Sequence, residues 1–365
     1  MSDAGGPGRR PTIRDVAARA GVSKSLVSLV MRGEPMVSED KRRRVQQAAA
    51  ELGYRTNFAA RSLSAVRSTT IGVLVSDLRN PLLVDVVERA AEVLEDSGLS
   101  TLITSAVRPP SGQGGPRVDQ RAIGAIKDLG VAGMLVVGSV PDRVAMAKIV
   151  GDLPLVVAAA TADGLNSDVV RNDDRLGMRL VVDYLVSRGH RSIAHLGGLG
   201  GGVADERAAG YRAAMQHHGL DDEIAIAEAD FTEDTGYRGT ASLLRRSESV
   251  TAIVAVNDLA AIGALSAAQD CGMTVPGDLA ITGYDDTFVA AIRQVSLTSI
   301  NPDSSGIGAL AARRLLERIE DPDVAVAEHL LPPRLVTRVS ASAPVPRREA
   351  GRAAAPDGRG RTSTG

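Results

Sequence analysis

The chain has 365 residues, of which 44% are apolar, and this length and composition suit two or three domains with cores of their own. Its single cysteine, Cys271, excludes a disulfide within the chain and a tetrahedral thiolate metal site. Residues 1–70 carry 13 lysines and arginines against six acidic residues, whereas the rest of the chain carries 29 lysines and arginines against 38 acidic residues. This uneven distribution indicates either an N-terminal head that contacts a polyanion or a basic face that is merely solvated.

The two ends of the chain are predicted to be disordered. Residues 1–11 and 343–365 are rich in glycine, proline and arginine and lack apolar periodicity. No apolar run reaches the roughly 18 residues that span a membrane, and the first residues lack the apolar stretch of a secretory signal. We therefore expect a cytoplasmic protein without a membrane partner.

Residues 12–56 are predicted to form three short helices. Apolar residues recur at helical spacing from Ile13 and in the two segments that follow. Thr12 begins the first helix with a capping-box-like pattern, and Gly21 makes the sharp turn into the second. This succession is typical of a helix-turn-helix, although an ordinary helical hairpin would show the same spacing.

The second predicted helix leaves several side chains exposed near its N-terminus, where a helix-turn-helix meets base edges in the major groove. A lysine can donate to guanine, a serine to several acceptors, and a leucine can contact a thymine methyl. The basic run DKRRRV at 40–45 suits phosphates, which position a protein without specifying sequence. The candidate base contacts are Lys24, Ser25, Ser28 and Leu29.

The connecting segment RTNFAARSLSAVRS, residues 55–68, holds three arginines, no acidic residue and one large aliphatic side chain, Leu63. It could be a linker, the end of a helix with its leucine in a core, or a positive surface with an exposed leucine. The composition alone leaves these three interpretations open.

From residue 71 to 342 the pattern becomes an alternation of short apolar runs and amphipathic helices. Such an alternation predicts an α/β body with parallel sheets covered on both faces. The strands are too many for one compact sheet, so we expect two similar lobes with a ligand cleft between them. The predicted strands are 71–75, 100–105, 133–138, 153–159, 192–198, 223–229, 251–256 and 279–284.

Motifs of common enzymes are absent from the sequence. No lysine follows a glycine, which excludes a phosphate loop, and the HLGGLGGG run at 195–202 fails the dinucleotide pattern and fits a strand-to-helix turn. There is no G-x-S-x-G and no H-E-x-x-H. We therefore expect no enzyme, no cofactor and no metal, and we expect Cys271 to be a small buried residue near a helix end.

Many motifs in one order resemble the LacI/GalR family of transcriptional regulators, over roughly residues 12–340. They include TIRDVAARAGVS, VSLVMRG, ARSL, IGVLVSDLRNP, YLVSRGHRSIAHLGG, ERAAGYRAAM, AVNDLAAIGAL, GYDDT and LTSINPD. The resemblance implies a helix-turn-helix DNA-binding head and a body like periplasmic sugar-binding proteins, with two lobes joined by three crossovers. It also implies a homodimer on a near-palindromic operator and a small-molecule effector in the cleft.

The resemblance assigns a role to the connecting segment, 57–70. In the family it forms a hinge helix in the minor groove, and its leucine enters a central base step. A leucine between base pairs unstacks and kinks the duplex, and arginines there lie in a strong negative potential. The DNA contacts that the resemblance implies are Thr12, Ser23, Lys24, Ser25, Ser28, Leu29, Asn57, Ala60, Arg61 and Leu63.

The resemblance also implies effector contacts in the cleft. A carboxylate and a guanidinium suit the hydroxyls of a sugar through charge-assisted hydrogen bonds. The implied contacts are Leu82, Leu83, Arg207, Phe231, Asn257 and Asp285. Two leucines stand where many relatives have aromatic residues, and Leu26 and Leu29 replace the frequent Thr and Arg, so the operator sequence does not carry over.

The function predicted from the sequence is a repressor controlled by a sugar or a related polar metabolite. The alternatives are a cytoplasmic sugar-binding or sugar-modifying protein with a nonspecific DNA-binding head, and an architectural DNA-binding protein without an effector. The C-terminus has no heptad run that would suggest a tetramerising coiled coil. The sequence does not decide between a dimer and a tetramer.

Overall fold

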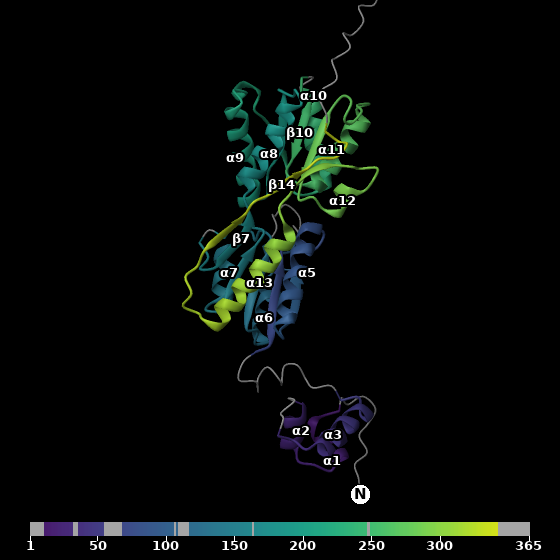
Figure 1. Cartoon of the computed structure of the whole chain (residues 1–365), viewed down its shortest axis with the longest axis vertical. Coiled ribbons are helices and arrows are strands. Elements are labelled where there is room, and N and C mark those ends of the chain that lie inside the picture. The colour runs from purple at the N-terminus through teal and green to yellow at the C-terminus, as the bar shows by residue number, and fades with distance from the viewer. Residues whose placement is uncertain are drawn as a thin grey trace, which may run out of the picture. The chain divides into compact units, whose positions relative to one another are not determined.

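The computed structural model describes residues 11–31, 36–54, 68–105, 107–108, 117–162, 164–246 and 249–341. The chain divides into two compact units, one with residues 1–69 and the other with nearly all of the rest (Figure 1). The first unit is a helical head and the second is an α/β body. In the part of the chain that the structure describes, no helix has the length and apolar character needed to cross a membrane.

The head contains three helices, α1 (Ile13–Ala20), α2 (Lys24–Met31) and α3 (Glu39–Glu51). Gly21 adopts a left-handed conformation with φ of 65°, which lets the chain turn sharply between α1 and α2. A Cβ at that position would lie 2.9 Å from Nη2 of Arg44, which donates a hydrogen bond to the carbonyl oxygen of Ala20. The predicted helix-turn-helix is therefore present, with a core of Val16, Ala17, Ala20, Val27, Val30, Val37, Val45, Ala48 and Ala49.

The N-terminal lobe of the body is built on a six-stranded parallel sheet in the order β13-β7-β6-β5-β1-β2. Its strands are β1 (Thr70–Val75), β2 (Ser100–Ser105), β5 (Gly133–Val137), β6 (Leu155–Ala158), β7 (Asp168–Asn172) and β13 (Glu328–Leu331). Its helices are α5 (Pro81–Asp96), α6 (Gln120–Asp128), α7 (Arg143–Val150) and α13 (Ser304–Glu320). A short antiparallel hairpin of β3 (Val107–Arg108) and β4 (Arg117–Val118) follows β2.

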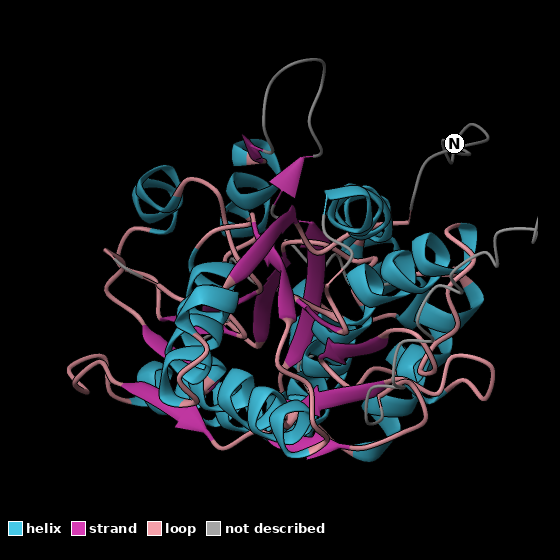
Figure 2. Ribbon diagram, turned by 90° about the horizontal axis from the view of Figure 1, so that it is seen from above, coloured by secondary structure: helices cyan, strands magenta, loops and turns pink. Residues whose placement is uncertain are grey.

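The C-terminal lobe has a second six-stranded sheet in the order β14-β12-β11-β10-β8-β9, in which only the edge strand β14 is antiparallel to its neighbour. Its strands are β8 (Ile193–Gly198), β9 (Ala225–Ala229), β10 (Ala252–Ala255), β11 (Ala280–Tyr284), β12 (Thr298–Asn301) and β14 (Arg334–Val336). Its helices are α8 (Asp174–Ser187), α9 (Gly202–His217), η1 (Asp221–Glu223), α10 (Glu233–Arg246), α11 (Asp258–Asp270) and α12 (Phe288–Ala291). Figure 2 shows helices on both sides of the strands, as the alternating sequence pattern predicts.

The chain crosses between the lobes three times, from β7 to α8, from β12 to α13 and from β13 to β14. The α/β class and the parallel sheets are confirmed, and all eight predicted strands are present. The prediction that Cys271 is buried is wrong. Cys271 follows the last residue of α11 and is exposed, because the buried face of that helix ends at Ala268.

Candidate functional sites

The guanidinium of Arg207 lies at the centre of a buried polar cluster in the C-terminal lobe. Its side chain is 3% exposed. Its Nε lies 2.8 Å from Oδ1 of Asp174, its Nη2 lies 3.2 Å from Oδ1 of Asp285, and its Nη1 donates to the carbonyl oxygen of Val256. The ring of Tyr284 covers one face of the guanidinium, with 3.6 Å from Cζ to the ring centroid. A buried charge with two carboxylate partners is held in one orientation.

Asp285 and Asp286 follow β11 in a turn that few non-glycine residues adopt. Their φ angles are 102° and 47°, both in the left-handed range. Asp258 holds the turn, because one carboxylate oxygen accepts from the backbone N–H and the hydroxyl of Thr287. The hydroxyl of Ser299 donates to the other oxygen, at 2.6 Å. The carboxyl of Asp285 is therefore placed by packing and hydrogen bonds rather than by local preference.

Asp285, which lies in this turn, and Asp258, which holds the turn, both have raised pKa values. Burial raises the pKa of Asp285 to about 7, and the nearby charge of Arg207 opposes that rise. Burial also raises the pKa of Asp258 to about 6, against hydrogen bonds from Ser299 and Thr287 that lower it. Near neutral pH the charge of Asp285 is therefore sensitive to its surroundings, as is common at functional sites.

The Arg207 cluster connects to the first crossover between the lobes. Nδ2 of Asn172, the last residue of β7, lies 2.6 Å from Oη of Tyr284 and 3.2 Å from Oδ1 of Asp174. A Cβ on Gly177 would lie only 2.2 Å from Oη of Tyr284, so the close approach of α8 depends on glycine there. Movement of one lobe against the other would act directly on the residues that hold Arg207.

The predicted effector residues fall into three groups in the structure. Arg207 and Asp285 are in contact, as described above. Asn257 caps α11 by accepting from the N–H of Ala260, and its Nδ2 lies 3.1 Å from the carbonyl oxygen of Phe231. The Phe231 ring packs beside the glycine-rich turn, where a Cβ on Gly200 would lie 2.6 Å from it.

Leu82 and Leu83 form the third group, in the first turn of α5. Each is 5% exposed and belongs to the hydrophobic core of the N-terminal lobe. Sequence reasoning did not single out Asp174, Asn172, Tyr284 or Asp258. The NDD triplet at 172–174 was the available signal, but the strand that precedes it was not predicted.

The candidate base contacts of the head differ in exposure. Ser23, Lys24 and Ser25 are exposed, whereas Ser28 and Leu29 are half-buried. Leu29 packs partly against the core of the head. The half of α2 nearest its N-terminus therefore carries the polar groups that are free to meet another molecule.

Thr12 and Ser23 lie at the starts of the two helices of the motif. Oδ2 of Asp15 accepts hydrogen bonds of 2.7 Å from both the backbone N–H and the hydroxyl of Thr12, and the Ser23 hydroxyl accepts from the N–H of Leu26 at 3.2 Å. These contacts fix the entry to each helix.

The remaining predicted DNA contacts, Asn57, Ala60, Arg61 and Leu63, lie outside the described residues, as do residues 1–10 and 342–365. Among the described residues, no group of three or more histidine, cysteine, aspartate or glutamate side chains is arranged to hold a metal ion.

A helix-turn-helix head joined to a two-lobed α/β body with three crossovers defines a class of DNA-binding regulators. Residues 12–57 match the family described as bacterial regulatory proteins, lacI family, and residues 182–341 match the periplasmic binding protein-like domain. The ribose operon repressor of Haemophilus influenzae is 32% identical over 335 residues, which cover 90% of this chain and 98% of the relative. The chain belongs to the LacI family and is a DNA-binding transcriptional regulator.

Solved structures of LacI family members are similar to this chain as well. The lac repressor dimer bound to operator and the anti-inducer ONPF is 28% identical, with a TM-score of 0.77 over 92% of this chain and 100% of that one. A LacI family regulator from Enterococcus faecium with bound ribose is 27% identical, with a TM-score of 0.66 over 75% of this chain and 99% of that one. The whole architecture, head and body, is therefore that of the family.

Proposed function

We propose that this chain is a homodimeric repressor in the cytoplasm, and that a sugar or a related polar metabolite bound between the lobes controls its affinity for an operator. One observation supports the effector site above all others. Arg207 is buried and oriented by Asp174 and Asp285, at the place where the chain first crosses between the lobes.

The chemistry of the cluster suits a polyol. A carboxylate accepts hydrogen bonds from vicinal hydroxyls and a guanidinium donates to them, and both kinds of bond are strengthened by charge. The second oxygen of Asp285 has no partner among the described residues. Asn257 and Phe231 follow the carboxyl ends of β10 and β9 in the same lobe, and Nδ2 of Asn257 donates to the carbonyl oxygen of Phe231. The bound ribose in the Enterococcus faecium relative supports a sugar as the class of effector.

Control of DNA binding by an effector requires a segment that can adopt two conformations. In the proposed mechanism this segment is 57–70, since so short a helix is only marginally stable unless other contacts support it. Closure of the lobes on the effector changes those contacts, and Leu63 then enters or leaves the base step. Base contacts from Lys24 and Ser25 supply the sequence preference.

The test is fluorescence anisotropy with DNA from the chain's own promoter, at fixed moderate salt, with and without a panel of sugars. Lys24→Ala should weaken specific binding by about tenfold, because a good base contact contributes about 1–3 kcal/mol. Lys148→Ala, an exposed lysine of the body, is the matched control and should leave affinity unchanged. Absence of binding to this DNA under every condition would contradict the proposal, and so would turnover of the sugar that binds.

A further inference from the structure

One glycine of the turn between β8 and α9 has no backbone reason to be glycine. Gly198, Gly200 and Gly201 have φ angles of 87°, 115° and 81°, in the left-handed range that favours glycine. Gly202, the first residue of α9, is outside that range. Its backbone therefore accepts an ordinary side chain, and the requirement for glycine comes from what surrounds it.

The neighbour of Gly202 belongs to the other lobe. A Cβ on Gly202 would lie 2.1 Å from Oγ1 and 3.2 Å from Cβ of Thr161, which follows β6 in the N-terminal lobe. Nη2 of Arg143 donates to the same hydroxyl at 3.0 Å and holds it in place. Because a β-branched side chain is stiff at χ1, Thr161 presents a fixed surface to the C-terminal lobe. The two lobes touch here, and glycine permits the approach.

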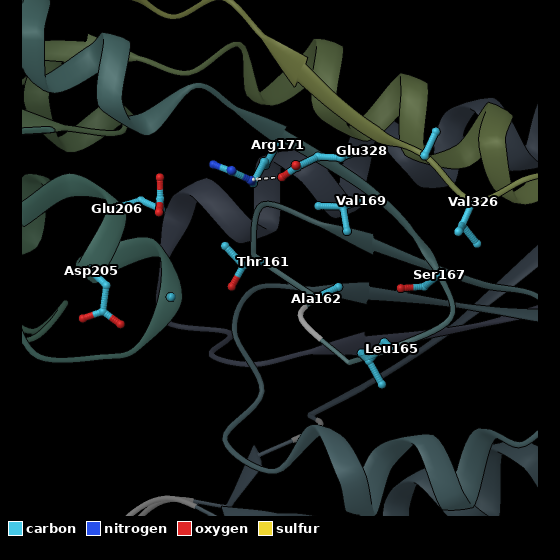
Figure 3. Close-up of a pocket in the computed structure, with 12 residues that line it drawn as sticks. Thr161, Ala162, Leu165, Ser167, Val169, Arg171, Asp205, Glu206, Val326 and Glu328 are labelled. Atoms are coloured by element: carbon cyan, nitrogen blue, oxygen red, sulfur yellow. Dashed lines mark hydrogen bonds and ion pairs between the residues drawn. The ribbon is translucent and has the colours of Figure 1, made fainter. Parts of the chain in front are cut away.

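The contact stands at the edge of an open space between the lobes. A cavity of about 450 Å³ lies beside it, and both Thr161 and Gly202 belong to the lining (Figure 3). Figure 3 shows Asp205 and Glu206 of α9 across this cavity from Glu328 of the N-terminal lobe. The lobes are therefore separated across the cavity and meet at its edge, which makes the contact a point of support rather than a packed interface.

Opposite charges draw the lobes toward this contact. At the first crossover, Nη1 of Arg171 in β7 lies 3.3 Å from Oδ2 of Asp174 in α8. Arg79 follows β1 in the N-terminal lobe, and Asp230 follows β9 in the C-terminal lobe. The hydrogen bond with Asp77 raises the pKa of Arg79 most, and the charge of Asp230 raises it further. Attraction alone fixes no separation between two bodies, whereas attraction against a rigid contact fixes one.

We propose that the contact between Gly202 and Thr161 is the stop at which closure of the lobes ends, so that glycine at 202 sets the closed position of the body. A side chain at 202 then holds the lobes apart, although Arg207 and Asp285 are unchanged. The consequence for DNA binding rests on the proposed function, in which closure of the lobes controls the segment 57–70.

Energy transfer between the lobes tests the stop without any effector. Dyes are attached to Cys271, exposed in the C-terminal lobe, and to the cysteine of Lys148→Cys in the N-terminal lobe, with unlabelled chain in excess. Gly202→Val should lower the transfer efficiency, and adding Thr161→Gly should restore it, because the second change makes room for the new side chain. Asp205→Val, which lines the cavity from the same turn of α9, is the matched control and should leave the efficiency unchanged. An efficiency that is unchanged in Gly202→Val, or that Thr161→Gly does not restore, would overturn the proposal.

A reversible cross-link gives a second readout of the same contact. Thr161→Cys combined with Gly202→Cys, in a Cys271→Ser background, places the two Cβ atoms 3.2 Å apart, close to the separation of about 3.5–4.5 Å that suits a disulfide. Mass spectrometry of the full chain should detect the bond after mild oxidation. Thr161→Cys combined with Asp205→Cys is the control pair and should not form it. Absence of the bond in the first pair would contradict the stop.

The cross-linked chain also separates this inference from the proposed function. Where the operator affinity of the wild-type chain responds to a sugar, the oxidised pair should not respond, and reduction should restore the response. A response that persists in the oxidised protein would show that closure does not end at this contact. A wild-type chain that responds to no sugar would contradict the proposed function instead, and the energy transfer and the disulfide would still decide whether the stop exists.

Discussion

Arg207 and Asp285 are 78 residues apart in the chain, yet Nη2 of the guanidinium lies 3.2 Å from Oδ1 of the carboxylate. Asp174, from the first crossover, holds the other side of the same guanidinium. A ligand that draws Asp285 away from Arg207 therefore changes a contact that reaches the connection between the lobes. In the proposed function, this relationship is what converts effector binding into a change in lobe position.

Asp285→Ala should abolish the response to the effector and leave operator binding without effector nearly unchanged. The variant lacks the carboxylate that is proposed to accept from the ligand, so effector affinity should fall by at least about tenfold. Calorimetry with the effector and anisotropy with operator DNA measure the two properties separately. Asp234→Ala, an exposed acid on α10, is the control, and a normal response in Asp285→Ala would remove this residue from the site.

The stability of the protein should depend on pH through the same carboxyl. Because the pKa of Asp285 rises from 3.8 in the unfolded chain to about 7 in the folded protein, the folded state retains a proton that the unfolded chain releases. The resulting stabilisation is complete below about pH 4 and is lost as pH rises through about 7.

Asp285→Asn, which mimics the neutral carboxyl, isolates this effect. The wild-type Tm should approach that of the variant near pH 4 and fall progressively below it toward pH 8, in scanning calorimetry of both proteins in matched buffers. The raised pKa of Asp258 acts in the same direction, and the charge of Asp258 is one cause of the raised pKa of Asp285, so part of the difference between the two proteins comes from that repulsion. A difference in Tm that stays constant across this range would contradict the assignment.

Leu63→Ala should weaken operator binding and spare effector affinity. A side chain that enters a base step contributes through the kink that it stabilises, so we expect a loss of at least about tenfold in operator affinity. Gel-shift titration measures it, and circular permutation of the operator site measures the bend. Leu330→Ala, a half-exposed leucine of β13, is the matched control. Unchanged affinity and bend would exclude the wedge role.

Gly177→Ala should destabilise the body by about 1–3 kcal/mol. Its Cβ would lie 2.2 Å from Oη of Tyr284, so either the tyrosine or helix α8 must move, at the cost of an overpacked core. Gly124→Ala, in α6, is the control, because a Cβ there meets nothing within 4 Å and alanine favours a helix. Urea unfolding should separate the two variants, and equal midpoints would show that Tyr284 relaxes freely.

Much of the architecture was predictable because its signals are local. The head helices follow from apolar spacing and from the turn at Gly21, and the eight predicted strands follow from short apolar runs between helices. The six strands β3, β4, β7, β12, β13 and β14 were missed, since VR, RV, DVVRN, TSIN, EHLL and RLV are short or interrupted by charged and polar residues. Their strand conformation depends on sheet neighbours that are distant in sequence.

The family, the α/β class and the choice of Arg207 and Asp285 as candidate site residues follow from the amino-acid sequence, because motifs in a fixed order carry that information. Which groups meet is visible in the folded protein alone. The tertiary structure placed Asp174 and Tyr284 on Arg207, put Leu82 and Leu83 in a core, and exposed Cys271. The physical reason is that burial and pairing depend on how α8, α9 and β11 pack at the crossovers, and no local pattern encodes that packing.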